Sequence, residues 1–393
     1  MGNRLRHLQG DERGVTLVFV GAGFLAFFAA TTLAIDVGMF MAARAQAQNS
    51  ADAGALAGAI ALVYDSYSDR SAGGPVVQSA INTAIANTVM GDPVDIQPSD
   101  VTFPTDPSGQ ANRVRVNVFR TMNRNNPLAT LIGPLLGVST VDIAATATAE
   151  AALANAMSCV KPFTIPDRWI EVGSPPWTST SSTYDRYDNQ GNLVQNPDYY
   201  PPVSDVDDPN DPNDSYYVGY DMEDDKGVLL TIRAGTGNNI SPGMYFSWAM
   251  PGGTGGSWYE QNIHTCNTTL VHFDDIMTLE PGNMVGPTNQ GIDALIAQDP
   301  TAYWDTNTNQ VVSTMNPSPR VFPIPLFDPE YYQSGIVSGR NTTLRVANWI
   351  GFFVVERNGN EVSGRITPII GITDENAGPA PPGTFPRVIR LVE

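Results

Sequence analysis

The sequence predicts an α+β fold, in which a long N-terminal transmembrane helix continues into a small α/β module and a β-rich C-terminal domain follows. The helix is indicated by residues 14–35, an uncharged run long enough to cross a bilayer. An alanine-rich, proline-free stretch extends the helix to about residue 62. The β-rich domain is indicated after Cys159, where helical periodicity fades and proline, glycine and aromatic residues become frequent.

The predicted boundaries follow these changes in composition, and the charges around the apolar run predict its orientation. Arginines precede the run and Asp36 follows it, so the positive-inside rule places the N-terminus in the cytoplasm and the bulk of the chain outside. A cleaved secretory signal is the alternative, but its apolar region would be shorter. We expect a cytoplasmic basic head at 1–13, a transmembrane and periplasmic rod helix at 14–62, an α/β module at 63–155 and a β-rich extracytoplasmic domain at 156–393.

Hydrophobic periodicity predicts the elements of the α/β module. Apolar residues at helical spacing predict an amphipathic helix at 76–89, and alternation with polar residues predicts a half-buried strand at 113–119. Residues 141–149 are rich in β-branched side chains and predict a second strand. The short apolar stretch 128–136 could form a second helix.

The C-terminal domain is predicted from short β-type runs between turn signals. One helix stands out, at 288–298 with Thr288 as its cap, where apolar residues recur at helical spacing before Asp299 and a proline. The Asn-Gly pair within residues 357–360 predicts a hairpin turn between the last two strands. The expected strands are 227–234, 244–249, 268–273, 342–356 and 361–372.

Charge and cysteine content narrow the classes of function. The net charge is −19, with 21 basic residues against 40 acidic ones, and this argues against nucleic-acid binding. The chain has two cysteines, Cys159 and Cys266, and an even pair outside the cytoplasm predicts a disulfide. Two free buried thiols are the alternative.

Small residues recur every fourth position along the predicted helix and therefore share a face. Such residues let helix backbones approach closely in lipid, so we expect packing against other helices. The alternative is that the stripe only reflects the abundance of alanine in helices. In the membrane segment the stripe comprises Ala22, Ala26, Ala30, Ala34, Gly38 and Ala42, and farther out Ala43, Ala47, Ala51, Ala55 and Ala59, with Gly54 and Gly58 beside them.

Residues 13–62 also carry a specific combination of residues at the start of the helix, at its membrane exit and in its alanine-rich part. The residues are Arg13, Gly14, Asp36, Gly38, Asn49, Ala51, Asp52, Ala53, Leu56 and Gly58. The combination resembles the TadE/TadG-like proteins of the tight-adherence (Flp) pilus system. The resemblance implies a pilin-like module after the helix, and a periplasm-facing, inner-membrane component of pilus assembly.

Two departures from related proteins refine the resemblance. Pilins are cut after a glycine and carry a glutamate five residues beyond the cut, whereas Gly14 is followed there by Phe19. We therefore expect an uncleaved, TadG-like anchor. Longer TadG-like proteins also resemble von Willebrand factor A adhesins, whose metal motif is Asp-Xaa-Ser-Xaa-Ser. The nearest text here, residues 65–69, has Tyr67 and Asp69 in place of the two serines, so we expect no such metal site.

An acidic stretch in the β-rich domain is the candidate metal site. Its carboxylates are oxygen ligands of the kind that calcium prefers, although the EF-hand spacing is absent. A solvated acidic loop is the alternative, and we expect no other cofactor. No catalytic motif occurs in the sequence, so we do not expect an enzyme. The candidate calcium ligands are Asp205, Asp207, Asp208, Asp211 and Asp214.

The sequence features predict a non-enzymatic, single-pass membrane protein, and the resemblance implies that it lies in the bacterial inner membrane and takes part in Flp pilus assembly. Its expected partners are pilin-like and pilus-assembly membrane proteins that pack against the rod helix, and the helix could also pair with a second copy of the chain. The part of the chain that follows the rod helix would make contacts in the periplasm. The alternative function is a surface or pilus-associated adhesin that binds calcium or glycan through the acidic β-rich domain.

Overall fold

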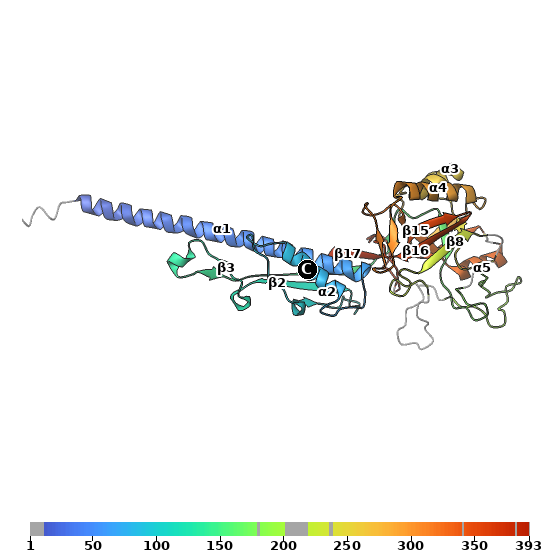
Figure 1. Cartoon of the computed structure of the whole chain (residues 1–393), viewed down its shortest axis with the longest axis horizontal. Helices are drawn as coiled ribbons and strands as arrows, with labels where there is room; N and C mark the ends of the chain where they lie inside the picture. The colour runs from blue at the N-terminus through green and yellow to red at the C-terminus, as the bar shows by residue number, and fades with distance from the viewer. Residues whose placement is uncertain are drawn as a thin grey trace, which may run out of the picture. The chain divides into compact units, whose positions relative to one another are not determined.

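The computed structural model describes residues 12–178, 181–200, 219–235, 239–339, 342–381 and 383–392. The chain divides into two compact units (Figure 1), which are residues 1–150 with 390–393, and residues 151–389. A long apolar helix, a mixed α/β part and a β-rich part follow one another along the chain, which confirms the predicted α+β class.

Unit 1 is organised around a single long helix, α1 (Glu12–Tyr64). At 1.5 Å per residue its 53 residues span about 80 Å. Against its C-terminal half pack α2 (Pro75–Ala86) and strand β2 (Arg113–Arg120). The helix predicted at 76–89 is confirmed as α2, but it ends earlier because Val89 turns back and forms a bridge with Asp92.

A four-stranded sheet with the order β1-β2-β5-β17 completes unit 1. The alternation predicted at 113–119 is confirmed, because β2 (Arg113–Arg120) buries every second residue and pairs antiparallel with β5 (Ile143–Leu153). The buried carboxylate of Glu150 lies 3.5 Å from both Arg113 and Arg390, which links the C-terminal residues of the chain to this sheet. The other elements are β1 (Val101–Thr102), β17 (Arg387–Leu391) and the 3₁₀ turns η1 (Pro98–Asp100) and η2 (Met122–Arg124).

The helix considered for 128–136 is wrong. The segment instead forms a hairpin in which β3 (Leu128–Ala129) pairs with β4 (Thr140–Val141), with the 3₁₀ turn η3 (Gly133–Leu136) between them. Gly133 and a proline interrupt the segment, and Gly137 adopts the left-handed conformation with φ of 82° that ends the turn.

Unit 2 contains a closed barrel. Six strands pair in the order β15-β14-β7-β9-β8-β16, and β16 pairs again with β15, so the sheet closes on itself. Phe163, Phe322 and Phe352 pack inside unit 2 with ring centroids about 6 Å apart. The barrel strands are β7 (Phe163–Pro166), β8 (Leu229–Ala234), β9 (Met244–Ser247), β14 (Val321–Phe327), β15 (Thr343–Asn358) and β16 (Glu361–Thr367).

In the described part of unit 2, helices and short strand pairings accompany the barrel. The predicted turn at 357–360 is confirmed, because β15 and β16 form a hairpin whose last pair is Asn358 and Glu361. The predicted helix at 288–298 begins earlier, at Val285, so Thr288 lies buried inside it rather than at its cap. The remaining elements are α3 (Gly256–His264), α4 (Val285–Gln298), α5 (Pro329–Ser338), β6 (Ala156–Met157) with β10 (Val271–His272), β12 (Tyr303–Asp305) with β13 (Gln310–Val312), and β11 (Ile276–Thr278) on β15.

Candidate assembly surface and membrane-proximal site

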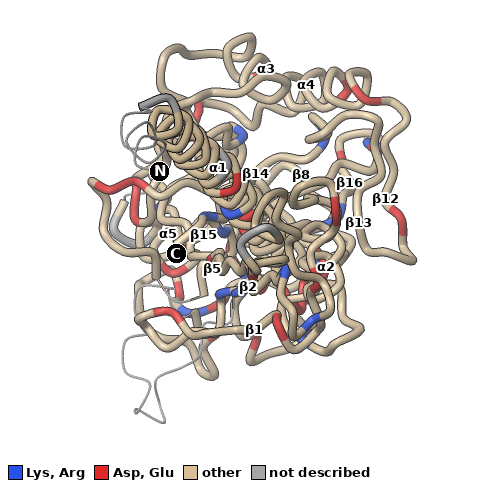
Figure 2. The backbone as a smooth tube through the Cα atoms, turned by 90° about the vertical axis from the view of Figure 1, so that its left-hand side faces the viewer, with Lys and Arg blue, Asp and Glu red and all other residues tan. Residues whose placement is uncertain are grey.

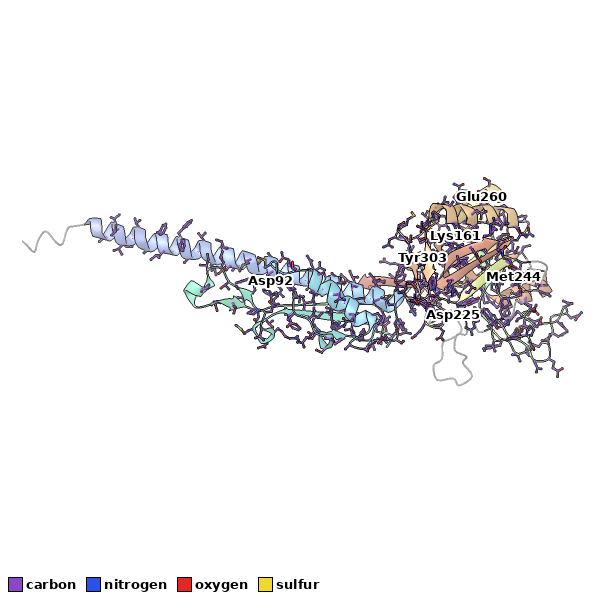
Figure 3. The ribbon with its side chains drawn as sticks, in the orientation of Figure 1. Asp92, Lys161, Asp225, Met244, Glu260 and Tyr303 are labelled. Carbon is purple, nitrogen blue, oxygen red and sulfur yellow. A yellow bond between two sulfur atoms is a disulfide. The ribbon has the colours of Figure 1, made fainter. Side chains whose placement is uncertain are left out.

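In the membrane half of α1, residues 14–35, every side chain that the structure describes is exposed. No charged residue lies between residues 14 and 35, so this part of α1 is tan in Figure 2. The side chains of this half stand clear of the rest of unit 1 (Figure 3). Among the described residues this is the one helix long and apolar enough to cross a membrane. The inner part of the small-residue stripe is exposed throughout: Ala22, Ala26, Ala30, Ala34, Gly38 and Ala42.

The outer part of the stripe is buried, because other elements of unit 1 cover it. A Cβ atom on Gly54 would lie 3.0 Å from the Ala84 Cβ of α2, and one on Gly58 would lie 2.7 Å from a methyl group of Val114. The expectation that these two glycines face another protein is therefore corrected, since they pack against α2 and β2 of the same chain. The alanines of this part are 0–1% exposed, namely Ala43, Ala47, Ala51, Ala55 and Ala59.

A leucine at position 58 tests this internal packing. We expect Gly58→Leu to destabilise unit 1 by about 1–3 kcal/mol, because the larger side chain overlaps Val114. Gly38→Leu is the matched control, since nothing lies within 4 Å of a Cβ atom at Gly38. Limited proteolysis of residues 63–150 in detergent measures the effect. Equal protection of both variants would contradict the assigned packing.

The family-motif residues lie along α1 on both sides of this division. Arg13 and Gly14 lie in the first turn, and Asn49 is exposed, whereas Ala51 and Gly58 are buried against the module. The part of the motif around residue 50 also holds α2 and β5 in place. Ser50 donates to the Ala84 carbonyl at 2.8 Å, and Gln48 donates to Asp52 and to the Thr146 carbonyl. Ala53 and Leu56 are half-buried.

Asp36 is buried, although it follows directly after the apolar run of α1. Its carboxylate accepts hydrogen bonds from three consecutive backbone N–H groups of the β3–β4 hairpin, those of Leu131 at 3.1 Å, Ile132 at 3.3 Å and Gly133 at 2.8 Å. Successive N–H groups that converge on one anion form a favourable binding concavity for a carboxylate. Asp36 therefore fixes the tip of the hairpin to α1. The sequence analysis identified Asp36 but not this partner.

Removing the carboxylate tests this attachment. We expect Asp36→Ala to accelerate amide hydrogen exchange of residues 131–133 roughly 10- to 100-fold, because each charge-assisted hydrogen bond contributes about 1.5–3 kcal/mol. Asp52→Ala is the matched control, since that carboxylate of α1 bonds Gln48 instead of the hairpin. Exchange mass spectrometry resolves the segment. Unchanged exchange in Asp36→Ala would show that other contacts hold the hairpin.

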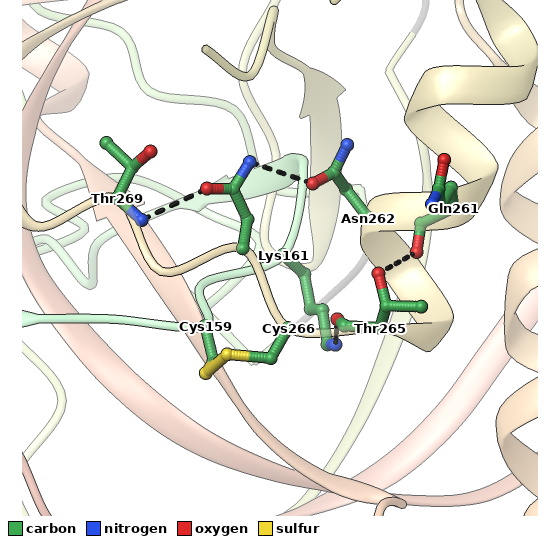
Figure 4. The surroundings of a disulfide bond; sticks show 8 residues. Cys159, Lys161, Gln261, Asn262, Thr265, Cys266 and Thr269 are labelled. Carbon is green, nitrogen blue, oxygen red and sulfur yellow. Dashed lines mark hydrogen bonds between the residues drawn. A yellow bond between two sulfur atoms is a disulfide. The ribbon is translucent and has the colours of Figure 1, made fainter. Parts of the chain in front are cut away.

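Unit 2 contains a disulfide between Cys159 and Cys266 (Figure 4). Beside it lies Lys161, whose ammonium donates to the Thr265 carbonyl at 3.0 Å and lies 5.3 Å from the ring centre of Phe322. The side chain is buried, and no ion pair joins it to a carboxylate in the described part of the chain. Desolvation lowers the pKa of Lys161 to about 7.

The calcium hypothesis falls on residues that the structure does not describe. Asp205, Asp207, Asp208, Asp211 and Asp214 all lie within 201–218, outside the described residues. Within the described ranges, no group of three or more His, Cys, Asp or Glu residues could hold a metal ion. The calcium hypothesis therefore stays a prediction.

Unit 1 combines an exposed apolar helix with an α/β module, and unit 2 contains a β-barrel, so the chain has the features of a protein with one membrane-capable helix. The comparison with protein families then shows what this helix is similar to. Residues 14–61, which lie within α1, match the family described as Putative Flp pilus-assembly TadE/G-like, and this confirms the resemblance seen in the sequence. No curated protein and no solved structure matches the chain.

Proposed function

We propose that this chain is a non-enzymatic, membrane-anchored component of tight-adherence (Flp) pilus assembly. In this proposal α1 stays uncleaved in the inner membrane, with its N-terminus in the cytoplasm, and unit 2 makes contacts in the periplasm. The observation that carries the proposal is the family match of residues 14–61, the segment that contains the membrane-capable run. The adhesin alternative gains no support from this match.

The proposed contact with pilin-like partners is the inner part of the small-residue stripe. Its alanines are exposed along α1, whereas the outer alanines are already covered by the same chain. Small residues allow helices to approach closely in lipid, where van der Waals packing rather than the hydrophobic effect drives association. The inner stripe is therefore the part of the stripe that remains free for another helix.

A leucine on the stripe tests the partner contact. We expect Ala30→Leu to reduce co-purification of pilin-like membrane proteins at least tenfold, because the larger side chain keeps the two backbones apart. The matched control is Gly21→Leu. Residue 21 lies nine positions, or two and a half turns, before residue 30, so the same leucine is placed on the opposite face of α1.

Quantitative mass spectrometry of detergent-solubilised complexes measures the association. Loss of the pilin-like proteins in Ala30→Leu, with retention in Gly21→Leu, supports the proposed face. Equal recovery from both variants would show that the stripe reflects only the composition of the helix. If no pilin-like protein co-purifies with the unaltered chain, the proposed partners are wrong.

A further inference from the structure

The tip of the β3–β4 hairpin is an apolar surface that unit 1 leaves uncovered. Residues 127–141 contain no charged side chain. Leu131 is 69% exposed and Val138 is 51% exposed, although both are large aliphatic residues. Thr130 donates to the Val138 carbonyl at 2.6 Å, and the Val138 N–H donates to Gly133, so the tip has a defined conformation. An ordered loop that presents aliphatic side chains outward indicates an apolar environment.

The hydrogen bonds of Asp36 fix the level of this tip along α1. Leu131 and Ile132 donate to Asp36, so the tip lies beside this residue. The exposed face of α1 stays apolar at the same level and beyond it, with Val37 at 41% and Met41 at 72% exposure. The next charged residue of α1 is Arg44. The hairpin tip and the helix therefore form one uncharged belt around Asp36.

The length of the uncharged part of α1 places this belt relative to a bilayer. Asp36 is the one charged residue of residues 14–43, which span about 45 Å. A bilayer with its headgroup regions is about 40–45 Å thick, of which about 30 Å is hydrocarbon. With Arg13 and Arg44 at the two polar boundaries, Asp36 lies about 12 Å inside the outer boundary. The hydrocarbon begins about 7 Å inside that boundary, so Asp36 lies about 5 Å beyond the border between headgroups and hydrocarbon.

We propose that the hairpin tip, residues 131–138, inserts into the outer interface of the membrane as a second lipid contact beside α1. In this proposal Leu131 and Val138 enter the lipid. The backbone N–H groups of Leu131 and Gly133 donate to Asp36, so they keep a hydrogen-bond acceptor when the tip leaves water. Two contacts at one level restrict rotation and tilt of α1, so the hairpin sets how unit 1 stands on the membrane. This inference rests on the membrane-spanning role of α1 in the proposed function.

Site-specific fluorescence in vesicles tests the insertion. The full-length chain is reconstituted into phosphatidylcholine–phosphatidylglycerol vesicles, and a polarity-sensitive dye is attached to Leu131→Cys under non-reducing conditions, which keep the native cysteines in their disulfide. Lipids with a spin label near the headgroup serve as quenchers for position 131, and lipids with a spin label near the end of the acyl chain serve as quenchers for position 24, which lies near the middle of the bilayer. Asn82→Cys on α2 is the control outside the membrane, and Phe24→Cys in α1 reports whether the helix itself has inserted.

The expected result is a two- to fourfold loss of emission by lipid quenching at positions 131 and 24, and none at 82. Quenching at 24 without quenching at 131 would overturn the hairpin insertion and leave the anchor intact. A blue-shifted but unquenched dye at 131 would also overturn it, because protein rather than lipid would then cover the tip. If position 24 is not quenched, the anchor and the hairpin proposal both fail.

Discussion

Replacing Cys159 and Cys266 together by serine is expected to lower the free energy of unfolding of unit 2 by about 4 kcal/mol. The disulfide joins residues 107 positions apart, and closing a loop of about 100 residues stabilises a folded chain by roughly 4.7 kcal/mol in the chain-entropy account, with 2–5 kcal/mol typical on removal. The effect should be confined to unit 2, because both cysteines lie in residues 151–389.

Tryptophan fluorescence measures this effect without interference from unit 1, because all six tryptophans lie between residues 169 and 349. A denaturant titration of the double-serine variant is compared with that of the unaltered chain, each with and without reductant. Reductant should lower the midpoint of the unaltered chain and leave that of the variant unchanged. Equal midpoints for the variant and the unaltered chain, both measured without reductant, would contradict the stabilising role of the disulfide.

Replacing Lys161 by methionine is expected to remove a pH dependence of stability. Burial lowers the pKa of Lys161 from 10.5 to about 7 in the folded state. Between these two values the unfolded chain keeps the proton that the folded chain has released, so the unfolded state binds more protons and stability rises with pH. The gain approaches about 1.4 kcal/mol per pH unit above pH 7, and amounts to about 2 kcal/mol between pH 7 and pH 9, because the folded-state lysine is half deprotonated at pH 7.

The comparison of the two proteins across pH isolates this lysine from every other titrating group. Lys161→Met should be more stable than the unaltered chain. The difference between their free energies of unfolding should be largest at pH 7 or below and should shrink as the pH rises to 9. Below about pH 6 the lysine is protonated in both states, so the two profiles should run parallel there. Parallel profiles over the whole range would show that burial does not perturb Lys161.

The elements that the sequence predicted correctly are those whose local pattern agrees with their final environment. The uncharged run of α1 predicts a helix wherever the segment is placed, and the alternation in β2 matches a strand with one buried face. Strand β14 was missed because Pro323 and Pro325 argue against a strand. In the barrel, their carbonyls still accept hydrogen bonds from the Lys161 N–H and the Thr164 hydroxyl.

The membrane-proximal site could be predicted only in part, because its two halves are far apart in the chain. Asp36 was identified as a motif residue, yet its partner Gly133 lies 97 positions later. The apolar stretch 128–136 was considered as a helix, and nothing local connects it with a carboxylate on α1. The stripe had a similar limit, since periodicity alone does not distinguish Gly38, which is open, from Gly58, which α2 and β2 cover.

The central claim, a role in assembly of the Flp pilus, is tested most directly by counting pili on cells that lack this chain. The count is made by electron microscopy beside a strain complemented with the unaltered chain and one complemented with Ala30→Leu. The proposal predicts few or no pili without the chain, a normal number after complementation, and a reduced number with Ala30→Leu. A normal number of pili on cells that lack the chain would contradict it.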